Sequence, residues 1–416
     1  MDYRSRVIDS ELCDRLSSTG AVILEGPKAC GKTTTARQFA ASEVLLDIDK
    51  NAREAAKIEP ELILSEKTPQ LIDEWQLEPN IWNHIRRTID KRGKPGQFIL
   101  TGSAVPPDDI TRHTGAGRLT RIKMRPMTLY ETGHSTGKIS LKGMFNGIPP
   151  SCKDPGLSIK DLAERIAVGG WPFLLDLDTT RSLQGVRSYL EEIRRVDISR
   201  ISNNKRDPNK VGWFLQSLAR NVSTQAAVST LAADMKGSNR TVHDDTVREY
   251  LNALSRLMII EEQPAWAPHL RSKSRLRKSS KHHFVDPSLA VAALHGTPER
   301  LLKDLDFLGL LFESLVIRDL RVFAQAIDAK VFHYLDNTGL EVDAVVEASD
   351  GRWGAFEVKL SSDRVEEGKN SLLKFIEKVD IKKCGKPDIL GVIVGKGYGH
   401  LREDGVAVIP IGALAP

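Results

Sequence analysis

The segment from Gly26 to Thr33 constrains the fold of this chain more than any other part. It reads GPKACGKT and so matches the pattern GxxxxGK(S/T), whose glycines let the backbone curl until its N–H groups face phosphate oxygens. The apolar run 21–24 precedes it, and the helix-compatible run 34–40 follows it. This strand–loop–helix order predicts a phosphate-binding loop in which Lys32 reaches the β- and γ-phosphates and the Thr33 hydroxyl binds Mg²⁺.

Carboxylates and hydroxyls follow two further predicted strands. Within the segment 69–76, a short apolar strand ends in two carboxylates, Asp73 and Glu74. In P-loop ATPases an aspartate at this point holds the water shell of Mg²⁺, and a following glutamate can polarise the attacking water, so Glu74 is the candidate catalytic base. The run 97–101 ends in Thr101, a polar group that could sense the γ-phosphate. The candidate residues for binding ATP and Mg²⁺ are Gly26, Gly31, Lys32, Thr33, Thr34, Asp73 and Thr101, with Thr33 and Asp73 on the metal.

The bulk composition is that of a globular protein with several domains. The 416 residues suffice for two to four domains, and 40% of them are hydrophobic and 28% charged. No run approaches the roughly 18 consecutive apolar residues of a membrane span, and the first residues lack the apolar core of a signal peptide. The four cysteines are far apart and form no CxxC pair, which predicts reduced thiols. We therefore expect a cytoplasmic protein without a membrane partner.

Strand and helix signals alternate over residues 1–135, which predicts an α/β domain with a parallel sheet and helices on both faces. The ligand would then bind at the carboxyl ends of the strands. The expected strands and helices are 21–25, 44–48, 70–73, 98–101 and 119–125, and 32–42 and 79–91. A segment rich in Gly, Ser and Pro opens the next region, 136–205, which we interpret as a linker followed by a helical segment.

Residues 206–297 have the layout of a winged helix. Three predicted helices, 211–221, 224–233 and 242–258, lead into a pair of strands. The connection between these strands contains the basic stretch 270–283. The third helix would be the reader of a DNA groove, and the net charge of +5 is compatible with DNA as a partner. The alternative is a protein-binding module, because winged helices also serve that role. The basic residues expected to contact DNA are Arg271, Lys273, Arg275 and Arg277.

A second candidate site lies in residues 298–416, which open with a helix and become rich in strands. Asp343 and the sequence Glu357-x-Lys359 fall on two strands joined by a turn, and alternation puts Glu357 and Lys359 on one face. Two carboxylates there could bind Mg²⁺, which activates water for attack on a phosphodiester, and the lysine could orient that water. Glu313 on the preceding helix could supply another metal ligand. The alternative is an exposed strand face that carries a Glu–Lys pair.

With these pieces placed, the whole chain resembles the prokaryotic AAA-type P-loop ATPases that carry a C-terminal domain of unknown function. The resemblance rests on the motifs Tyr3-x-x-Arg6-x-x-Asp9, Gly26 to Thr34, Ile72 to Gln76, Ile99 to Ser103, Gly117 to Leu119, Arg125-Pro126-Met127 with Glu131, Gly169 to Pro172, Phe312-Glu313, Glu341 to Asp343 and Glu357 to Lys359. It implies a winged helix joined to a restriction-endonuclease-like PD-(D/E)xK fold, in which Asp343, Glu357 and Lys359 share a catalytic site. Members of that superfamily are often inactive as nucleases.

The resemblance also makes Arg118 a candidate catalytic residue. It could contact the γ-phosphate in cis or from a neighbouring subunit of a homo-oligomer, as arginine fingers do. The alternative is a surface arginine. The segment 279–289 departs from the family pattern, which has a Pro-Lys pair and an Asp-x-Gly there, so the tip of the wing is expected to differ.

Two functions follow from the sequence. In the first, the protein is an ATP- and Mg²⁺-dependent ATPase that controls a DNA-directed C-terminal half, with metal-dependent nuclease activity as an open question. In the second, it is a nucleotide-gated regulatory switch whose C-terminal half binds a protein partner and cleaves nothing.

Overall fold

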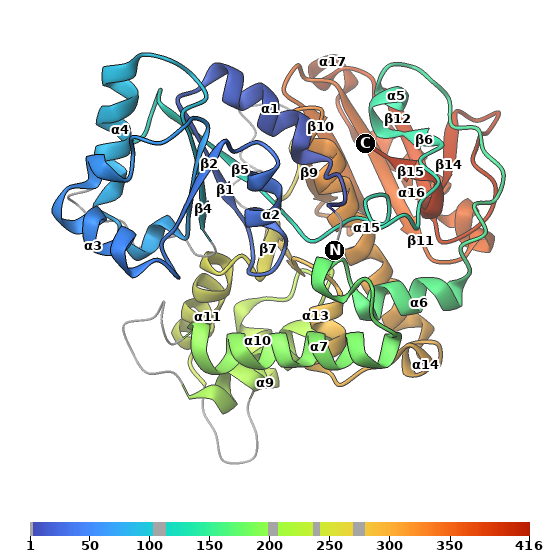
Figure 1. Cartoon of the computed structure of the whole chain (residues 1–416). Helices are drawn as coiled ribbons and strands as arrows, with labels where there is room; N and C mark the ends of the chain where they lie inside the picture. Colours follow the sequence, from blue (N-terminus) through green and yellow to red (C-terminus); the bar gives the residue numbers. More distant parts are fainter. Residues whose placement is uncertain (1–2, 103–113, 199–206, 236–241, 269–278) are drawn as a thin grey trace. The chain divides into compact units, whose positions relative to one another are not determined.

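The chain divides into two compact units in the computed structural model, which describes residues 3–102, 114–198, 207–235, 242–268 and 279–416 (Figure 1). The first unit comprises Met1–Pro126 with Arg256–Met258, and the second comprises Met127–Ser255 with Ile259–Pro416. No helix in these described ranges is long and apolar enough to cross a membrane.

The first unit is built on a parallel sheet of five strands in the order β2-β3-β4-β1-β5. The strands are β1 (Ala21–Glu25), β2 (Ser42–Leu45), β3 (Gln70–Asp73), β4 (Phe98–Gly102) and β5 (Leu119–Lys123). The prediction of a parallel sheet is confirmed. The parallel register brings the carboxyl ends of β1, β3 and β4 to one edge of the sheet.

Helices cover both faces of this sheet, because its strands are apolar on both sides. They are α1 (Ile8–Ser18), α2 (Lys32–Arg37), α3 (Lys50–Ile58) and α4 (Ile81–Arg92). Along β1, Ile23 belongs to the core under α3 and α4, whereas Val22 and Leu24 belong to the core under α1 and α2 (Figure 1). Successive side chains of a strand point to opposite faces, so one short run serves two cores.

The second unit contains a helical part and one antiparallel strand pair. Its main elements are α6 (Ile159–Val168), α7 (Thr179–Glu192), α9 (Pro208–Arg220), α10 (Val228–Asp234), α11 (Asp244–Arg256), β7 (Ile260–Gln263), β8 (Lys281–Phe284), α13 (Ser288–Ala293) and α14 (Pro298–Leu301). All six residues of α13 are buried. Three helices followed by an antiparallel pair is the element order that the sequence predicts for 206–297.

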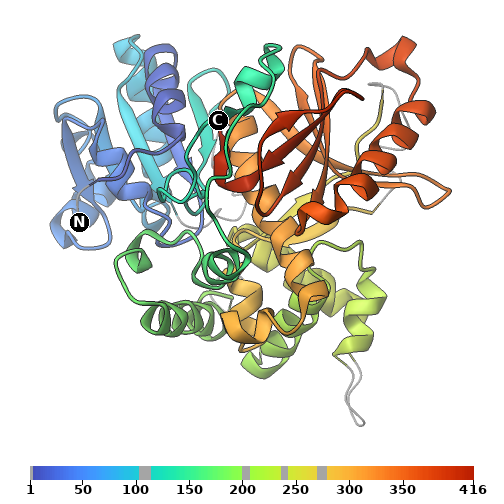
Figure 2. The same ribbon diagram turned by 90° about the vertical axis from the view of Figure 1, so that its right-hand side faces the viewer.

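Another part of the second unit is a six-stranded mixed sheet in the order β13-β14-β12-β11-β10-β9. Figure 2 shows this sheet in orange and red. Its strands and helices are α15 (Leu305–Gln325), β9 (Ala329–Leu335), β10 (Glu341–Ala348), β11 (Trp353–Lys359), α16 (Val365–Lys378), β12 (Ile389–Val394), β13 (His400–Leu401) and β14 (Val406–Pro410). Leu372 and Phe375 of α16 pack on the sheet beside Val342 and Trp353. The predicted hairpin is β10 and β11, and the fold class of an α/β N-terminal domain with a further α/β domain is confirmed.

A buried network of charges joins distant parts of the second unit. Arg318 of α15 pairs with Asp286 and Asp319 at 2.7 Å each. Asp286 also accepts a bond from the Gly170 N–H at 3.0 Å, and Asp319 accepts one from the Leu129 N–H at 3.0 Å. A Cβ on Gly170 would lie 1.9 Å from a backbone oxygen, so only glycine fits there. Part of the family resemblance therefore falls on residues that hold the fold together.

Candidate functional site

The phosphate loop begins where β1 ends and has a backbone that glycine makes possible. Gly31 has a φ of +101°, and Ala29 has a φ of +59°. A Cβ on Gly26 would lie 2.3 Å from the Met124 carbonyl oxygen. Gly26 is therefore required because the backbone there approaches a carbonyl oxygen closely, and Gly31 because its backbone is left-handed.

Lys32 lies inside the loop that it follows. Its Nζ donates hydrogen bonds to the carbonyl oxygens of Gly26, at 3.0 Å, and of Pro27, at 2.8 Å, and only 6% of the residue is exposed. These two carbonyl oxygens thus hold the ammonium group against the start of the loop. Thr34, the neighbouring candidate in α2, is exposed.

Side chains from the start of α2 and from the ends of β3 and β4 meet at the carboxyl edge of the sheet. Thr33 donates a hydrogen bond from Oγ1 to Asp73 Oδ1 at 2.9 Å. Thr101, at the end of β4, donates to the same oxygen in a very short contact. Asp73 and Thr101 are both buried. The structure therefore brings together Thr33, Asp73 and Thr101, which the sequence marked separately.

Glu74 follows directly on β3 and has a left-handed backbone, with a φ of +52°. The Gln76 side-chain amide donates to its carboxylate in a very short hydrogen bond. For a non-glycine residue such a φ is uncommon, and it turns the chain sharply after the strand. The sequence assigns Gln76 no role beyond its place in the motif Ile72 to Gln76, and the contact gives it a candidate role in orienting Glu74.

Arg6 is a second residue whose position the sequence did not predict. Its buried guanidinium donates to the carbonyl oxygen of Cys30, within the phosphate loop, at 2.8 Å, and to that of Arg125 at 2.7 Å. Asp9 accepts from the Arg6 backbone N–H and from the Tyr3 hydroxyl. The spacing Tyr3-x-x-Arg6-x-x-Asp9 was the available signal, and the contacts explain it as a brace for the loop.

Arg118 lies at the opposite edge of the sheet. It precedes β5, and its carbonyl oxygen accepts from the N–H of Ala21, the first residue of β1, whereas the phosphate loop follows the last. Its Nε donates to Asp90 at 2.6 Å. The structure does not bring Arg118 together with the phosphate loop of the same chain. A finger role therefore stays a prediction for a neighbouring subunit.

The groups at the carboxyl edge fit a magnesium nucleotide. Mg²⁺ binds hard oxygen ligands. The Thr33 hydroxyl and the Asp73 carboxylate are such ligands, and their oxygens lie 2.9 Å apart. The Gly26 backbone lies too close to the Met124 carbonyl oxygen for a Cβ to fit, and the buried Lys32 ammonium group lies against the same turn. Both features suit a phosphate chain with its metal ion.

The second candidate site lies on β10 and β11 of the other unit. The antiparallel register sets Ala344 opposite Phe356, so Asp343 and Glu357 are the next residues along the two strands. Asp343 Oδ2 accepts a hydrogen bond from the Val358 N–H at 2.8 Å. Glu357 accepts from Lys359 Nζ at 2.8 Å and from the Ser371 hydroxyl of α16 at 2.9 Å.

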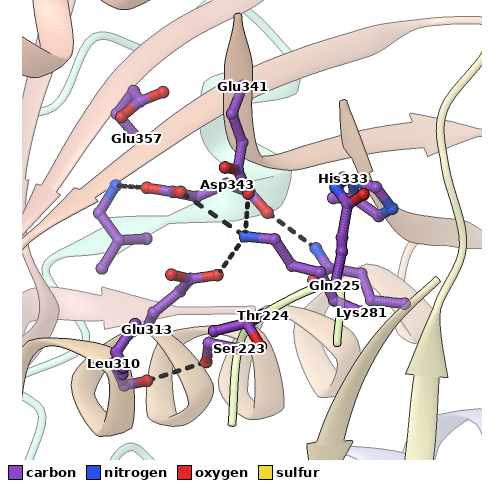
Figure 3. Close-up of polar contacts among 12 residues, drawn as sticks. Ser223, Thr224, Gln225, Lys281, Leu310, Glu313, His333, Glu341, Asp343 and Glu357 are labelled. Atoms are coloured by element: carbon purple, nitrogen blue, oxygen red, sulfur yellow. Dashed lines mark hydrogen bonds and ion pairs between the residues drawn. The ribbon is translucent and has the colours of Figure 1, made fainter. Parts of the chain in front are cut away.

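A residue that the sequence did not single out lies among these acids. Lys281 of β8 is only 2% exposed, and Figure 3 shows its ammonium group between three carboxylates. The distances from Nζ are 2.8 Å to Glu313, 2.5 Å to Glu341 and 3.9 Å to Asp343. Lys281 and His283 close the basic stretch of the sequence, and both are buried. The four arginines and lysines expected to contact DNA, Arg271, Lys273, Arg275 and Arg277, lie outside the described residues.

Burial and like charge alter the acids of this site. Burial and the nearby Asp343 carboxylate raise the pKa of Glu313 to about 8, against the opposing effect of Lys281. Burial and Asp343 likewise raise the pKa of Glu357 to about 8, against Lys359. Burial alone would lower the pKa of Lys281, but the carboxylates of Glu313, Asp343 and Glu341 outweigh it and raise that pKa.

These acids do not form a ready cation site. Within the described ranges no group of three or more His, Cys, Asp or Glu side chains is arranged to hold a metal ion. The carboxylates of Glu313, Asp343 and Glu357 each already accept from a protein donor, respectively Lys281, the Val358 N–H, and Lys359 with Ser371. The assignment of Glu313, Asp343 and Glu357 as metal ligands stays a prediction.

Comparison with known proteins divides the chain into three segments. Residues 18–133 match the family described as AAA domain. The N-terminal domain is an AAA-type, P-loop ATPase-like domain. Residues 159–300 and 308–414 match two families described as domains of unknown function, DUF8612 and DUF4143. The matched AAA segment contains the phosphate loop, Asp73, Glu74 and Thr101.

Two mycobacterial relatives match most of the chain. Uncharacterized proteins of Mycobacterium bovis and Mycobacterium tuberculosis are each 26% identical over 347 residues, which is 82% of this chain and 70% of the relative. A solved Walker-type ATPase of Pyrococcus abyssi is 13% identical and covers 70% of this chain and 96% of its own, with a TM-score of 0.44. A DNA replication initiation factor is also 13% identical and covers 61% and 90%, with a TM-score of 0.24.

Proposed function

We propose that this protein is an ATP- and Mg²⁺-dependent P-loop ATPase whose nucleotide state controls its C-terminal half. The observation that carries the proposal is the contact between Thr33 Oγ1 and Asp73 Oδ1 at the mouth of the phosphate loop. Two oxygen donors of the required kind meet there, beside a buried lysine and directly before Glu74. The AAA family match over 18–133 supports the same conclusion.

Each residue at this edge has a distinct role in the proposal. The loop backbone and Lys32 bind the phosphates, and Thr33 and Asp73 hold Mg²⁺, which offsets phosphate charge when bound. Glu74 accepts a proton from the attacking water, and Gln76 orients the Glu74 carboxylate through the amide contact. Arg6 braces the loop from behind through the Cys30 carbonyl. Thr101 keeps Asp73 in place and lies where a polar group could sense the γ-phosphate.

The C-terminal half has two candidate roles. In the first it is a winged helix with a PD-(D/E)xK-like domain that acts on DNA, with Asp343, Glu357 and Lys359 as nuclease residues. In the second it is a binding scaffold controlled by the ATPase, without nuclease activity. The Lys281 ammonium group beside Glu313 and Asp343 favours the second role, because a divalent ion between these carboxylates would face its repulsion.

An ATPase assay with and without duplex DNA, paired with a Mg²⁺ or Mn²⁺ cleavage assay, separates the candidates. ATP hydrolysis by the purified chain supports the proposed function, and no hydrolysis under any of these conditions contradicts it. Stimulation by DNA favours the DNA-directed role, and cleavage adds the nuclease. Hydrolysis that DNA leaves unchanged, together with no DNA affinity, favours the protein-binding switch.

A further inference from the structure

A heavily charged and buried cluster surrounds Lys281 in the second unit, apart from the nucleotide site. The sequence predicts a divalent ion between the carboxylates of Glu313, Asp343 and Glu357. The side chain that actually lies against Glu313 and Asp343 is the ammonium group of Lys281, 2.8 Å and 3.9 Å from their oxygens. Glu341, at 2.5 Å, is its third carboxylate partner (Figure 3).

The strand pair β7–β8 holds this lysine firmly. Two residues beyond Lys281, the buried His283 bonds through its ring to the Gln263 side-chain oxygen at 2.9 Å. The Gln263 amide in turn donates to the carbonyl oxygens of Phe332 and Asp343, at 2.9 Å and 2.8 Å. Gln263 pairs with Lys281 in the β7–β8 register, so these bonds join the strand pair that carries Lys281 to the strand that carries Asp343. The Lys281 side chain is therefore fixed by the packing around it and is not a mobile side chain on the surface.

Lysines already bring positive charge to these carboxylates. Lys281 faces Glu313, Glu341 and Asp343, and Lys359 faces Glu357. A buried carboxylate needs a cation or a proton, and here lysines supply the cations from within the chain. A divalent ion added beside the Lys281 ammonium group would face its repulsion at short range.

We propose that Lys281 is the resident cation of this site, so that the C-terminal domain excludes a divalent metal ion from Glu313 and Asp343. The domain then keeps the shape of a nuclease-like fold and uses its acids to fix β7–β8 onto α15 and β10. The inference concerns the C-terminal unit alone and does not depend on ATP hydrolysis by the other unit.

The test is Mn²⁺ binding by the nucleotide-free full chain, followed by the electron paramagnetic resonance signal of free Mn²⁺. We expect the wild type and Asp343→Asn to bind the same amount of Mn²⁺. Lys281→Met removes the ammonium group and keeps an unbranched stem, so it should gain one Mn²⁺ site. The double variant Lys281→Met/Asp343→Asn should lose that gain. Mn²⁺ should also raise the thermal midpoint of Lys281→Met and leave the wild-type midpoint unchanged.

Two further variants control this test. Lys281→Arg keeps the positive charge and should gain no Mn²⁺ site. If Lys281→Met does not fold, the comparison of the wild type with Asp343→Asn still tests the proposal. Lys378→Met removes a lysine that pairs with Asp336 at 2.7 Å elsewhere on the same domain, and it should behave as the wild type. Wild-type Mn²⁺ binding that Asp343→Asn abolishes would overturn the proposal. So would a folded Lys281→Met protein that gains no site.

Discussion

Thr33 Oγ1 donates a hydrogen bond of 2.9 Å to Asp73 Oδ1, although the two residues are 40 positions apart in the chain. The contact joins the phosphate loop after β1 to the end of β3, and β4 between them adds the Thr101 hydroxyl to the same carboxylate oxygen. Because the strands are parallel, these groups share one edge of the sheet. The nucleotide site in our account is built at this edge.

Arg6→Ala should weaken nucleotide binding and lower the stability of the N-terminal unit. The substitution leaves the carbonyl oxygens of Cys30 and Arg125 without the Arg6 donor. A buried polar group that loses its partner costs about 1–3 kcal/mol. The dissociation constant of a fluorescent ATP analogue and the urea unfolding midpoint measure the two effects. Arg15→Ala, on an exposed arginine of α1, is the control and should change neither. Equal behaviour of the two variants would contradict the bracing role.

Arg118→Ala tests a role between subunits, because Arg118 lies at the far edge of the sheet from its own loop. If a neighbouring chain supplies this arginine, the substitution should reduce turnover on the order of 10³-fold with little change in ATP affinity. Mixing it with Lys32→Ala protein should then restore some turnover, since each variant supplies the part that the other lacks. Full turnover by Arg118→Ala alone would leave Arg118 as a surface residue paired with Asp90.

Much of the N-terminal unit could be predicted from the sequence, because its signals are local. Short runs of sequence contain the phosphate loop and the ends of β3 and β4. The alternation of strands and helices, which predicts a parallel sheet, is also visible in short runs. Helix α1 was missed although Ile8, Leu12 and Leu16 repeat at helical spacing and are buried. The edge of the sheet on which Arg118 lies depends on the register of β1 with β5, which short runs do not reveal.

The C-terminal cluster shows the limit of reading residues in sequence order. Alternation correctly predicted that Asp343 and Glu357 would lie on paired strands. In the sequence Lys281 is merely the end of a basic stretch, because its partners Glu313 and Asp343 lie far along the chain. Only the packing of β8 against α15 and β10 turns this lysine inward, and no local pattern carries that information.

Neutralising the basic stretch should weaken DNA binding, if the C-terminal half acts on DNA. A variant with Arg271, Lys273, Arg275 and Arg277 changed to alanine should lose affinity for every DNA sequence. The slope of log K against log salt should fall by roughly one unit for each DNA phosphate that the protein no longer neutralises. Fluorescence anisotropy over a range of salt concentrations measures this slope. A slope equal to that of the wild type would exclude these residues from DNA binding.

The stability of the second unit should fall as the pH rises through about 8. The pKa of Glu313 is raised to about 8 in the folded state, where Glu313 faces Lys281, Asp343 and Glu341, and is near its ordinary value when unfolded. The folded state therefore binds the proton more tightly, so this stabilisation is complete at low pH and is lost at high pH. Glu357 acts in the same direction.

Glu313→Gln should flatten this pH dependence, because the amide does not titrate. Urea unfolding at about pH 6 and about pH 9 should show a difference in unfolding free energy on the order of a few kcal/mol for the wild type, and a smaller one for the variant. Glu403→Gln, on an exposed glutamate, is the matched control and should retain the wild-type dependence. A pH dependence that Glu313→Gln leaves unchanged would contradict the raised pKa.

ATP hydrolysis by Glu74→Gln tests the central claim most directly, with nucleotide affinity measured on the same protein. Glu74 has a sharply turned backbone after β3, beside the Thr33–Asp73 contact, and an amide in its place cannot accept a proton from water as a carboxylate can. We predict that Glu74→Gln binds ATP like the wild type and hydrolyses it at least about 100-fold more slowly. Lys32→Ala, by contrast, should lose both affinity and hydrolysis. Hydrolysis by Glu74→Gln at the wild-type rate would contradict the account.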